Sequence, residues 1–414
     1  MKKLITLVLV AMLAAACCFG VVGCGGGDDG KPVAGLICLH GESSTYDKNF
    51  IDAFKAACEV KGVKYIVVTG INEDEACYTK ALDLVDQGCK VIFADSFGHE
   101  PYMLRAAQEN PNVEFAHATG TQSKVKNVKN YHNAFASIYE GRYLAGYAAG
   151  LKLNTMKDKA VNNNFKVGYV GAFTYAEVIS GYTSWFLGLQ AALDEGYTAT
   201  MEVQFTGSWY DETGEKEAAE TLIRNGCVLV SQHADSMGAP TACDNAGVPN
   251  VSYNGSTQKD TLIGYSKINW QPYFEYMLDN YASHTIKTDY CGTVSDGSVQ
   301  YDVSGKAAVE GSAAKLEEVK AELLAGTRKV FDCSKFTVTV VPGSDGKNQN
   351  ATVDSNGHLT KYLADVDGDY AGDTDVIKTK DGITYFDESN ADDFRSAPYF
   401  DLQIDGITLL NAKF

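Results

Sequence analysis

Motifs that identify enzymes and energy-coupling proteins are missing from this sequence. The phosphate-binding pattern G-x-x-x-x-G-K-[ST] does not occur in its 414 residues, so the chain is not the ATPase of a transporter. No G-x-G-x-x-G follows the first predicted strand, and G-x-S-x-G and H-E-x-x-H are absent, which leaves dinucleotide, serine-hydrolase and zinc-protease chemistry without support. The seven histidines are not paired at metal-ligand spacing. We therefore expect no enzyme activity, no catalytic residue, no cofactor and no metal.

Basic residues are scarce. The chain has 35 Lys and Arg residues against 53 Asp and Glu residues, which gives a formal net charge of -18. So acidic a protein repels nucleic acid and anionic lipid headgroups. We expect neither of them as a partner.

No Cys-x-x-Cys pair exists among the eleven cysteines, which disfavours a zinc cluster. Once the leader described below is set aside, the cysteines that remain are Cys38, Cys58, Cys77, Cys89, Cys227, Cys243, Cys291 and Cys333. An even set outside the cytoplasm is compatible with disulfides. However, Cys38, Cys89 and Cys227 lie in apolar, strand-like runs, where buried free thiols behave as small hydrophobic side chains. The sequence leaves the pairing open.

One apolar run lies near the start of the chain, from Leu4 to Ala16, and it is too short to remain as a membrane span. Two lysines precede it, which is typical of a signal peptide. The following V-V-G-C, which ends at Cys24, resembles a bacterial lipobox. We expect residues 1–23 to be a signal peptide and residues 24–32 to be a lipidated cysteine with a flexible tether, on the extracytoplasmic face of a bacterial cell membrane. Plain secretion is the alternative.

Short apolar runs alternate with amphipathic ones in two successive series. The first covers about residues 33–120 and begins with the strand-like run from Ala34 to His40. The second series restarts near Lys166. Strands and helices that alternate at these lengths predict parallel sheets with right-handed crossovers. We therefore predict an α/β fold with two doubly wound parallel-sheet lobes and a hinge.

The same pattern gives a domain division. We predict that lobe 1 comprises residues 33–155 and is completed by roughly residues 275–335, and that lobe 2 comprises residues 160–270. Residues 336–414 are rich in Gly and Asp, and we predict an insertion of hairpins and loops followed by terminal strands.

One run in this C-terminal part has an ion-binding pattern. In D-V-D-G-D-Y-A-G-D, from Asp365 to Asp373, carboxylates alternate around a glycine, an arrangement that can wrap Ca²⁺. The late bidentate Glu of an EF-hand loop is missing, and polar turns between hairpin strands explain the run at least as well. The sequence leaves its role open.

The chain resembles the BMP (basic membrane protein) family of ABC-transporter substrate-binding lipoproteins. The matching blocks, in order, are T-Y-D-K-N-F, Y-E-G-R-Y-L-A-G, V-G-A-F-T-Y-A-E-V-I-S-G-Y, T-G-S-W-Y-D-E-T-G-E-K-E-A-A, V-S-Q-H-A-D-S and F-R-S-A-P-Y-F-D-L-Q-I-D-G-I-T. The resemblance implies a type I periplasmic-binding-protein fold that takes purine nucleosides or nucleobases. One block departs from the family, because Asn254 stands where a ribose-contacting Asp is often found. That departure favours a base or another heterocycle over a nucleoside.

Ligands of open α/β sheets bind beyond the carboxyl ends of the strands, so the residues just after each strand are candidate contacts. We predict a ligand site that contains Ser44, Tyr46, Asp47, Phe50, Ser96, Phe97, Phe173, Tyr175, Trp209, His233, Asp235, Asn254 and Trp270. Aromatic and hydrogen-bonding groups recur among them, as a planar polar ligand requires. Core packing remains open for Phe50, packing of the hinge for Trp270, helix capping for Asp47, and a purely structural role for His233. For Glu140 and Arg142 we expect a solvated or hinge ion pair.

The sequence thus predicts a monomeric lipoprotein that binds a purine base or nucleoside and docks on a cognate ABC permease. The lipid anchor would be its only contact with the membrane. The alternatives are a binding protein for another small solute, such as a sugar or a signal molecule, and an unrecognised extracellular enzyme.

Overall fold

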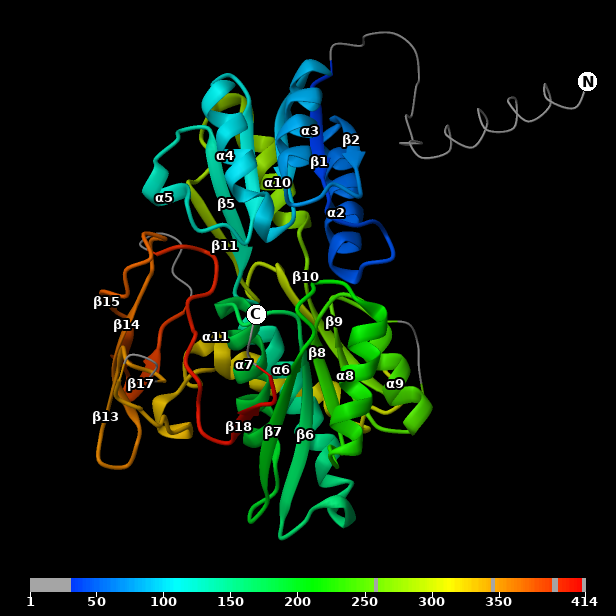
Figure 1. Ribbon diagram of the computed structural model, residues 1–414, viewed down its shortest axis with the longest axis vertical. Helices are drawn as coiled ribbons and strands as arrows, with labels where there is room; N and C mark the ends of the chain where they lie inside the picture. The colour runs from blue at the N-terminus through cyan, green and yellow to red at the C-terminus, as the bar shows by residue number, and fades with distance from the viewer. Residues whose placement is uncertain (1–30, 257–259, 344–346, 389–393, 412–414) are drawn as a thin grey trace, which may run out of the picture.

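The computed structural model describes residues 31–256, 260–343, 347–388 and 394–411. The predicted signal peptide and the cysteine at position 24 lie outside these residues. Two large sheets, each flanked by helices, account for most of the described chain (Figure 1). The fold is therefore α/β, as predicted, and each sheet with its helices forms one lobe.

The first sheet is wholly parallel, and its strand order is β11-β5-β4-β3-β1-β2. Its strands are β1 (Val33–Ile37), β2 (Lys64–Val68), β3 (Cys89–Ala94), β4 (Glu114–Ala118), β5 (Tyr131–Ala136) and β11 (Asp289–Gly292). The helices of this lobe are α2 (Thr45–Lys61), α3 (Glu75–Asp86), α4 (Glu100–Glu109), α5 (Ser123–Lys126) and α10 (Gln271–Asn280). Lobe 1 is built on this sheet.

The second sheet has the order β12-β10-β9-β8-β6-β7-β18, with β12 antiparallel to its neighbour. Its strands are β6 (Asn164–Gly171), β7 (Thr198–Phe205), β8 (Val230–His233), β9 (Asn250–Tyr253), β10 (Leu262–Ile268), β12 (Val299–Asp302) and β18 (Ile407–Leu409). Around it lie α6 (Ile138–Asn154), α7 (Ala176–Ala192), α8 (Glu212–Arg224), α9 (Gly238–Ala246) and α11 (Ser312–Ala325). Lobe 2 is built on this sheet.

The chain passes between the two sheets three times. It leaves the first sheet after β5 for α6, returns between β10 and α10, and leaves again between β11 and β12. Three neighbouring connections of this kind act as a hinge, because a few residues at the ends of elements absorb the rotation of one lobe against the other.

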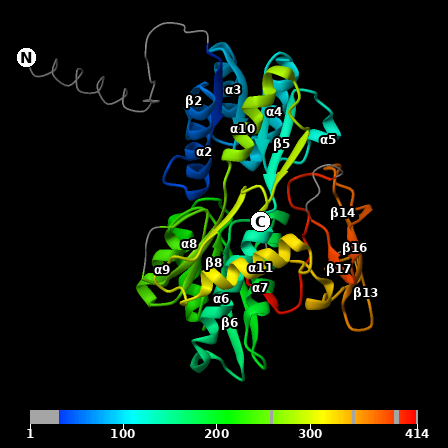
Figure 2. The ribbon, with the colours of Figure 1, turned by 180° about the vertical axis from the view of Figure 1, so that it is seen from behind.

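Two helices lie in a different lobe from the one our predicted division gave them. Helix α6 and helix α11 belong to lobe 2, and Figure 2 shows α11 beside α6. Glycines bring α6 and α7 together: a Cβ at Gly146 would lie 1.9 Å from the carbonyl oxygen of Trp185, and one at Gly188 would lie 2.0 Å from that of Tyr143. The Gly- and Ala-rich segment therefore packs within lobe 2 instead of extending lobe 1.

The C-terminal residues form a β-rich appendage beside lobe 2, drawn in orange and red (Figure 1). Its strands are β13 (Ala351–Val353), β14 (Leu359–Ala364), β15 (Thr374–Asp375), β16 (Ile377–Lys380) and β17 (Ile383–Phe386). Stacking of Phe331 on Phe400, with ring centroids 4.3 Å apart, joins the appendage to the hydrophobic core of lobe 2. The appendage also reaches lobe 1, because Gln122 donates to the carbonyl of Gly368 at 2.7 Å.

Most thiols of the described chain are unpaired and buried: those of Cys38, Cys58, Cys77, Cys89, Cys227, Cys243 and Cys333. These buried thiols therefore form no disulfides and pack as small hydrophobic side chains. No helix in the described ranges is both long enough and apolar enough to cross a membrane.

Candidate ligand-binding site

A small cavity lies between the two lobes. Its lining residues are Tyr46, Phe97 and Thr119 of lobe 1 and Glu177, Trp209, His233, Asp235 and Tyr253 of lobe 2. Its side chains leave little free space in this conformation. The lining is mainly aromatic with a few placed polar groups, which is the common composition of small-molecule sites.

The parallel sheets explain why these residues meet. Phe97 follows β3, Thr119 follows β4, Trp209 follows β7 and Asp235 follows β8, so each lies just beyond the carboxyl end of a strand. Strands that run in one direction bring their carboxyl ends to the same edge of a sheet, where ligands of open α/β folds bind. In this structure the two such edges face each other across the cavity.

Aromatic rings form a continuous wall that crosses from one lobe to the other. The rings of Phe97 and Tyr175 have centroids 5.0 Å apart, and Phe173 stacks on Tyr175 at 5.2 Å. Phe173 in turn contacts Trp209 edge-on at 5.0 Å. Phe173 and Tyr175 are not among the residues that line the cavity. Their rings contact Trp209, which does line it, and support its position.

His233 and Glu177 form the buried polar pair of the cavity, with the His233 Nε2 atom 3.3 Å from Glu177 Oε1. Burial raises the pKa of the Glu177 carboxyl to about 7, against a smaller opposite effect of the Arg142 guanidinium. Burial also holds the pKa of His233 well below its usual value, and Arg142 acts in the same direction. The neutral imidazole and the Glu177 carboxyl share one hydrogen bond, which fixes the ring beside the cavity.

Asp235 offers acceptors that the protein itself does not use. Burial, followed by the charges of Asp47, Glu215 and Glu177, raises the pKa of its carboxyl well above the ordinary value. Among the residues that the structure describes, no hydrogen bond satisfies this carboxyl group. Leaving a buried polar group unpaired costs about 1–3 kcal/mol, so a ligand that donates hydrogen bonds here gains affinity.

Arg142 lies beneath this polar group and is buried, in contrast to the solvated or hinge ion pair expected from the sequence. Its guanidinium carbon is 3.3 Å from the ring centroid of Tyr253, and its Nη1 donates to the carbonyl of Gln232 at 2.8 Å. Glu140 instead accepts from the backbone N–H of Val294 at 3.2 Å, in the third connection between the sheets. The prediction of an ion pair between Glu140 and Arg142 is therefore wrong, because each side chain bonds to a separate backbone group.

Two residues at the cavity edge have left-handed backbone conformations that are costly for side chains other than Gly. Thr119 has a φ of 63° and Asn254 a φ of 58°. Strain of this kind costs about 1–3 kcal/mol per residue and is concentrated at functional sites. Asn254 also accepts a hydrogen bond from Asn49 of lobe 1 at 3.1 Å.

The first turn of α2 also ties the lobes together in this conformation. The backbone N–H of Thr45 donates to the carbonyl of Asp235 at 3.1 Å, and its hydroxyl donates to the carbonyl of Tyr253 at 3.2 Å. The first backbone N–H groups of a helix have no partner inside the helix, so they are free to make such contacts. Lobe 2 residues of the cavity are thereby held directly against lobe 1.

Several predicted site residues lie elsewhere. Phe50 and Trp270 stack on each other, with centroids 4.3 Å apart, in the fully buried core of lobe 1. Ser44 caps α2 by accepting the N–H of Asp47, and it donates its hydroxyl to that carboxylate at 2.5 Å. Ser96 donates its hydroxyl to Glu73 at 2.6 Å. These contacts assign the four lobe 1 residues to packing and local hydrogen bonding in this conformation.

Of the predicted residues, Tyr46, Phe97, Trp209, His233 and Asp235 line the cavity. Sequence reasoning missed Thr119, Glu177 and Tyr253. Thr119 and Tyr253 end strands that the pattern had located, so the strand-end rule applied to every strand would have found them. Glu177 lies in the first turn of α7, within a block already matched to the family.

The acidic run of the appendage forms a polar turn. Asp365, Asp367 and Asp369 place their carboxylates close together, and each accepts a backbone N–H within its own loop. Asp365 also pairs with Arg395 at 3.0 Å. Turn structure thus accounts for the contacts of this run.

Comparison with known proteins places the chain among transport receptors. Residues 40–294, more than half of the chain, match the family Bmp, described as ABC transporter substrate-binding protein PnrA-like. A Haloferax volcanii protein, named provisionally as the ABC transporter glucose-binding protein TsgA13, is 36% identical over 164 residues, which are 40% of this chain and 38% of that protein. A purine-binding protein of Brucella abortus is 31% identical over 190 residues, which are 45% of this chain and 50% of that protein.

The matched stretches thus span half or less of these two relatives. A crystal structure of a solute-binding protein of an ABC transporter system from Aeropyrum pernix K1 superposes with a TM-score of 0.60 at 14% identity, over 72% of this chain and 93% of that one. This likeness confirms the predicted periplasmic-binding-protein-like fold. Members of the family bind solutes outside the cytoplasm and are not enzymes. The chain belongs to the Bmp family of ABC-transporter solute-binding proteins.

Proposed function

We propose that this protein binds a purine nucleobase or nucleoside in the cavity between its lobes and delivers it to an ABC permease. The observation that carries the proposal is the pairing, in one cavity, of aromatic rings with a buried carboxyl group that has no partner in the described chain. A purine has a flat face for the rings and N–H groups for the carboxyl. The purine-binding relative from Brucella supports the same ligand class.

The aromatic wall and the polar groups would act on different parts of the ligand. Stacking of a base on an aromatic side chain contributes about 1–3 kcal/mol in nucleic-acid binders. Asp235 would accept N–H groups on the edge of the base, and a ligand without those groups would leave the carboxyl unpaired at a similar cost. Stacking would therefore supply affinity, and Asp235 would supply selectivity.

Binding would also bias the position of the lobes. A ligand that contacts Trp209 on lobe 2 and Phe97 on lobe 1 binds the closed arrangement better than an open one, so it shifts the population towards closure. The closed form would then dock on the permease. A lipid at Cys24 would hold the protein close to that permease and raise its local concentration.

A sugar is the second candidate, and the relative named as a glucose-binding protein supports it. Carboxyl groups that accept hydrogen bonds from hydroxyls, together with a ring that packs on an apolar sugar face, also suit a hexose. The two ligand classes differ in the contact they make with Trp209, because only a purine presents an aromatic ring to it.

A thermal-shift screen tests the proposal. The purified chain would be heated with adenine, guanine, hypoxanthine, their nucleosides, glucose and galactose. We expect stabilisation by at least one base or nucleoside, and recovery of that ligand unchanged. Stabilisation by sugars alone would replace the purine assignment, and conversion of the ligand to a product would overturn the receptor assignment.

A further inference from the structure

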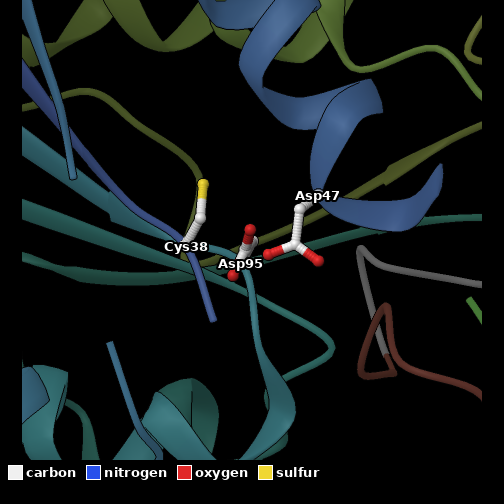
Figure 3. A group of neighbouring side chains, drawn as sticks. All are labelled: Cys38, Asp47 and Asp95. Carbon is white, nitrogen blue, oxygen red and sulfur yellow. The ribbon is translucent and has the colours of Figure 1, made fainter. Parts of the chain in front are cut away.

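A second group of chemically active side chains lies in lobe 1, outside the cavity lining. Cys38, Asp47 and Asp95 each bring one potential ligand atom to the group, and these atoms all lie within 4.8 Å of one another (Figure 3). All three residues are buried, with exposed fractions of 0%, 1% and 0%. The proposed ligand chemistry of the cavity uses none of them.

The sheet topology brings these residues together. Cys38 follows β1 directly and Asp95 follows β3 directly, and the two strands are neighbours with Ile37 opposite Ala94. Asp47 is in the first turn of α2, the helix that follows β1. The group therefore lies at the carboxyl edge of the first sheet.

The hydrogen bonds of the group leave acceptor capacity free. Asp47 Oδ1 accepts the backbone N–H of His40 at 2.7 Å, and Asp95 Oδ1 accepts that of Leu39 at 3.1 Å. The other oxygen of Asp95, Oδ2, is buried and has no hydrogen-bond partner in the described part of the chain. Figure 3 shows the Asp95 carboxyl lying between the Cys38 side chain and the Asp47 carboxyl (Figure 3).

Positive charge near the group is confined to its solvent side. Within the described ranges, neither Asp47 nor Asp95 forms an ion pair with Lys or Arg, and Lys55 pairs with Glu42 instead. The nearest basic group is His40, whose Nδ1 is 3.6 Å from Asp47 Oδ2 and whose side chain is one-third exposed. Asp47 is stabilised by hydrogen bonds from Ser44 and His40, but the buried Asp95 carboxyl beside it has no compensating charge. The pair therefore requires either a proton or a cation.

We propose that Cys38, Asp47 and Asp95, with His40 as the solvent-side ligand, bind a divalent zinc ion. Thiolate, carboxylate and imidazole together are a zinc donor set, whereas Ca²⁺ and Mg²⁺ select oxygen. Bond lengths to zinc of about 2.0–2.3 Å require ligand atoms about 3.5 Å apart. Cys38, Asp47 and Asp95 therefore draw together on binding, and His40, which lies outside their group, turns towards the ion. His40 gives the ion a path from solvent.

The position of the site couples it to the cavity wall. Tyr46, which lines the cavity, donates its hydroxyl to the backbone carbonyl of Asp95 at 2.8 Å. The ring of His40 lies 5.4 Å from that of Tyr210 in lobe 2. Bound zinc would thus stiffen the lobe 1 side of the cavity, independently of which ligand the cavity takes.

The test uses the reduced, full mature chain after removal of metals by a chelator. Zn²⁺ would be titrated in competition with a chromophoric chelator, and Co²⁺ would be added separately as a spectroscopic probe. We expect one equivalent of Zn²⁺ and a thiolate-to-cobalt charge-transfer band. Cys38→Ser should abolish the band and weaken Zn²⁺ binding at least tenfold. Cys77→Ser, a matched change of another buried lobe 1 cysteine, should leave both unchanged.

His40→Ala keeps the test decisive if the buried variants do not fold, because His40 is partly exposed. It should weaken Zn²⁺ binding while circular dichroism shows a native fold. Failure of the folded wild-type chain to bind Zn²⁺ would overturn the proposal and leave a shared proton as the neutralising charge. Zn²⁺ binding that survives both Cys38→Ser and His40→Ala would overturn it as well. Either result leaves purine binding unaffected, so failure of the two proposals can be told apart.

Discussion

The two lobes contribute differently to the cavity between them. The polar groups of lobe 1 that line it are already bonded within that lobe: Tyr46 donates to the carbonyl of Asp95, and Thr119 to that of Ala118. On lobe 2, the hydroxyl of Tyr253 and the Nδ1 atom of His233 are buried without a hydrogen-bond partner, as far as the described residues extend, and the carboxyl of Asp235 lines the cavity. Lobe 1 therefore contributes mainly contact surface to a ligand. Lobe 2 contributes polar groups that still have free hydrogen-bonding capacity.

The same contrast separates the tryptophans of the predicted site. Trp270 is 2% exposed and packs among Phe50, Phe93 and Phe274 in the core of lobe 1. Trp209 is partly exposed and lines the cavity from lobe 2. One ring therefore holds its lobe together, and the other is available to a ligand. Under the proposed function, lobe 2 would select the ligand first and lobe 1 would then close over it.

The largest effect that we expect comes from Trp270→Ala. Removal of a fully buried indole leaves a cavity in the core, which costs about 3–5 kcal/mol. Urea denaturation of the apo protein should show this loss as a lower free energy of unfolding. A loss of ligand affinity with unchanged apo stability would instead move Trp270 from the core to the site and break the comparison.

The next largest effect should come from Asp235→Ala. Loss of a hydrogen bond to a charged or strongly polar acceptor costs about 1.5–3 kcal/mol, which corresponds to roughly a 10- to 100-fold weaker Kd. Calorimetric titration with the best ligand of the thermal-shift screen measures this change. Asp158→Asn, which alters an exposed carboxylate of the same lobe, is the control and should bind normally. Equal affinity of the Asp235→Ala variant would contradict the selective role of lobe 2.

For Trp209→Ala we expect a loss of ligand-induced stabilisation with the apo fold intact. Stacking worth about 1–3 kcal/mol corresponds to roughly a 5- to 100-fold weaker Kd for a base. A thermal-shift assay with and without ligand separates the two effects. A fall in apo stability as large as that of Trp270→Ala would show that Trp209 is a core residue, and the contrast between the tryptophans would disappear.

A gradual effect, spread over several pH units, is a pH dependence that originates in lobe 2. The pKa of Glu177 is raised to about 7 in the folded protein, and the groups around it are His233, Asp235, Tyr46, Tyr253 and Arg142. A carboxyl with a raised pKa contributes stability below its unfolded value near 4.5 and loses it as pH rises towards 7. The slope is at most about 1.4 kcal/mol per pH unit.

Denaturation of wild type and of Glu177→Gln between pH 4.5 and 8 measures this slope. The wild type should lose stability relative to the variant as pH rises through this range, because the amide does not ionise. Parallel curves for the two proteins would show that Glu177 does not titrate in this window.

Much of the fold could be predicted from the sequence because the signals are local. Buried strands of four to eight residues alternate with amphipathic helices, and this rhythm fixes a parallel α/β architecture. The lobe assignment of α6 could not be predicted, since it depends on the backbone contact that Gly146 permits with Trp185. That contact joins segments about forty residues apart and has no local signature.

The candidate site could be predicted in part for a related reason. The strand-end rule places Phe97, Trp209 and Asp235 at the cavity, because strand ends are visible in the apolar pattern. The rule cannot distinguish a side chain that faces the cavity from one that turns inward, as Phe50 does. The left-handed φ of Thr119 could not be predicted either, because threonine rarely adopts this conformation.

A crystal structure of the protein with its tightest-binding purine tests the central claim most directly. We predict that the base stacks on Trp209 between the lobes, with its N–H groups donating to the Asp235 carboxyl of lobe 2. A purine bound outside this cavity, or one whose polar edge is satisfied by lobe 1 alone, would contradict the account.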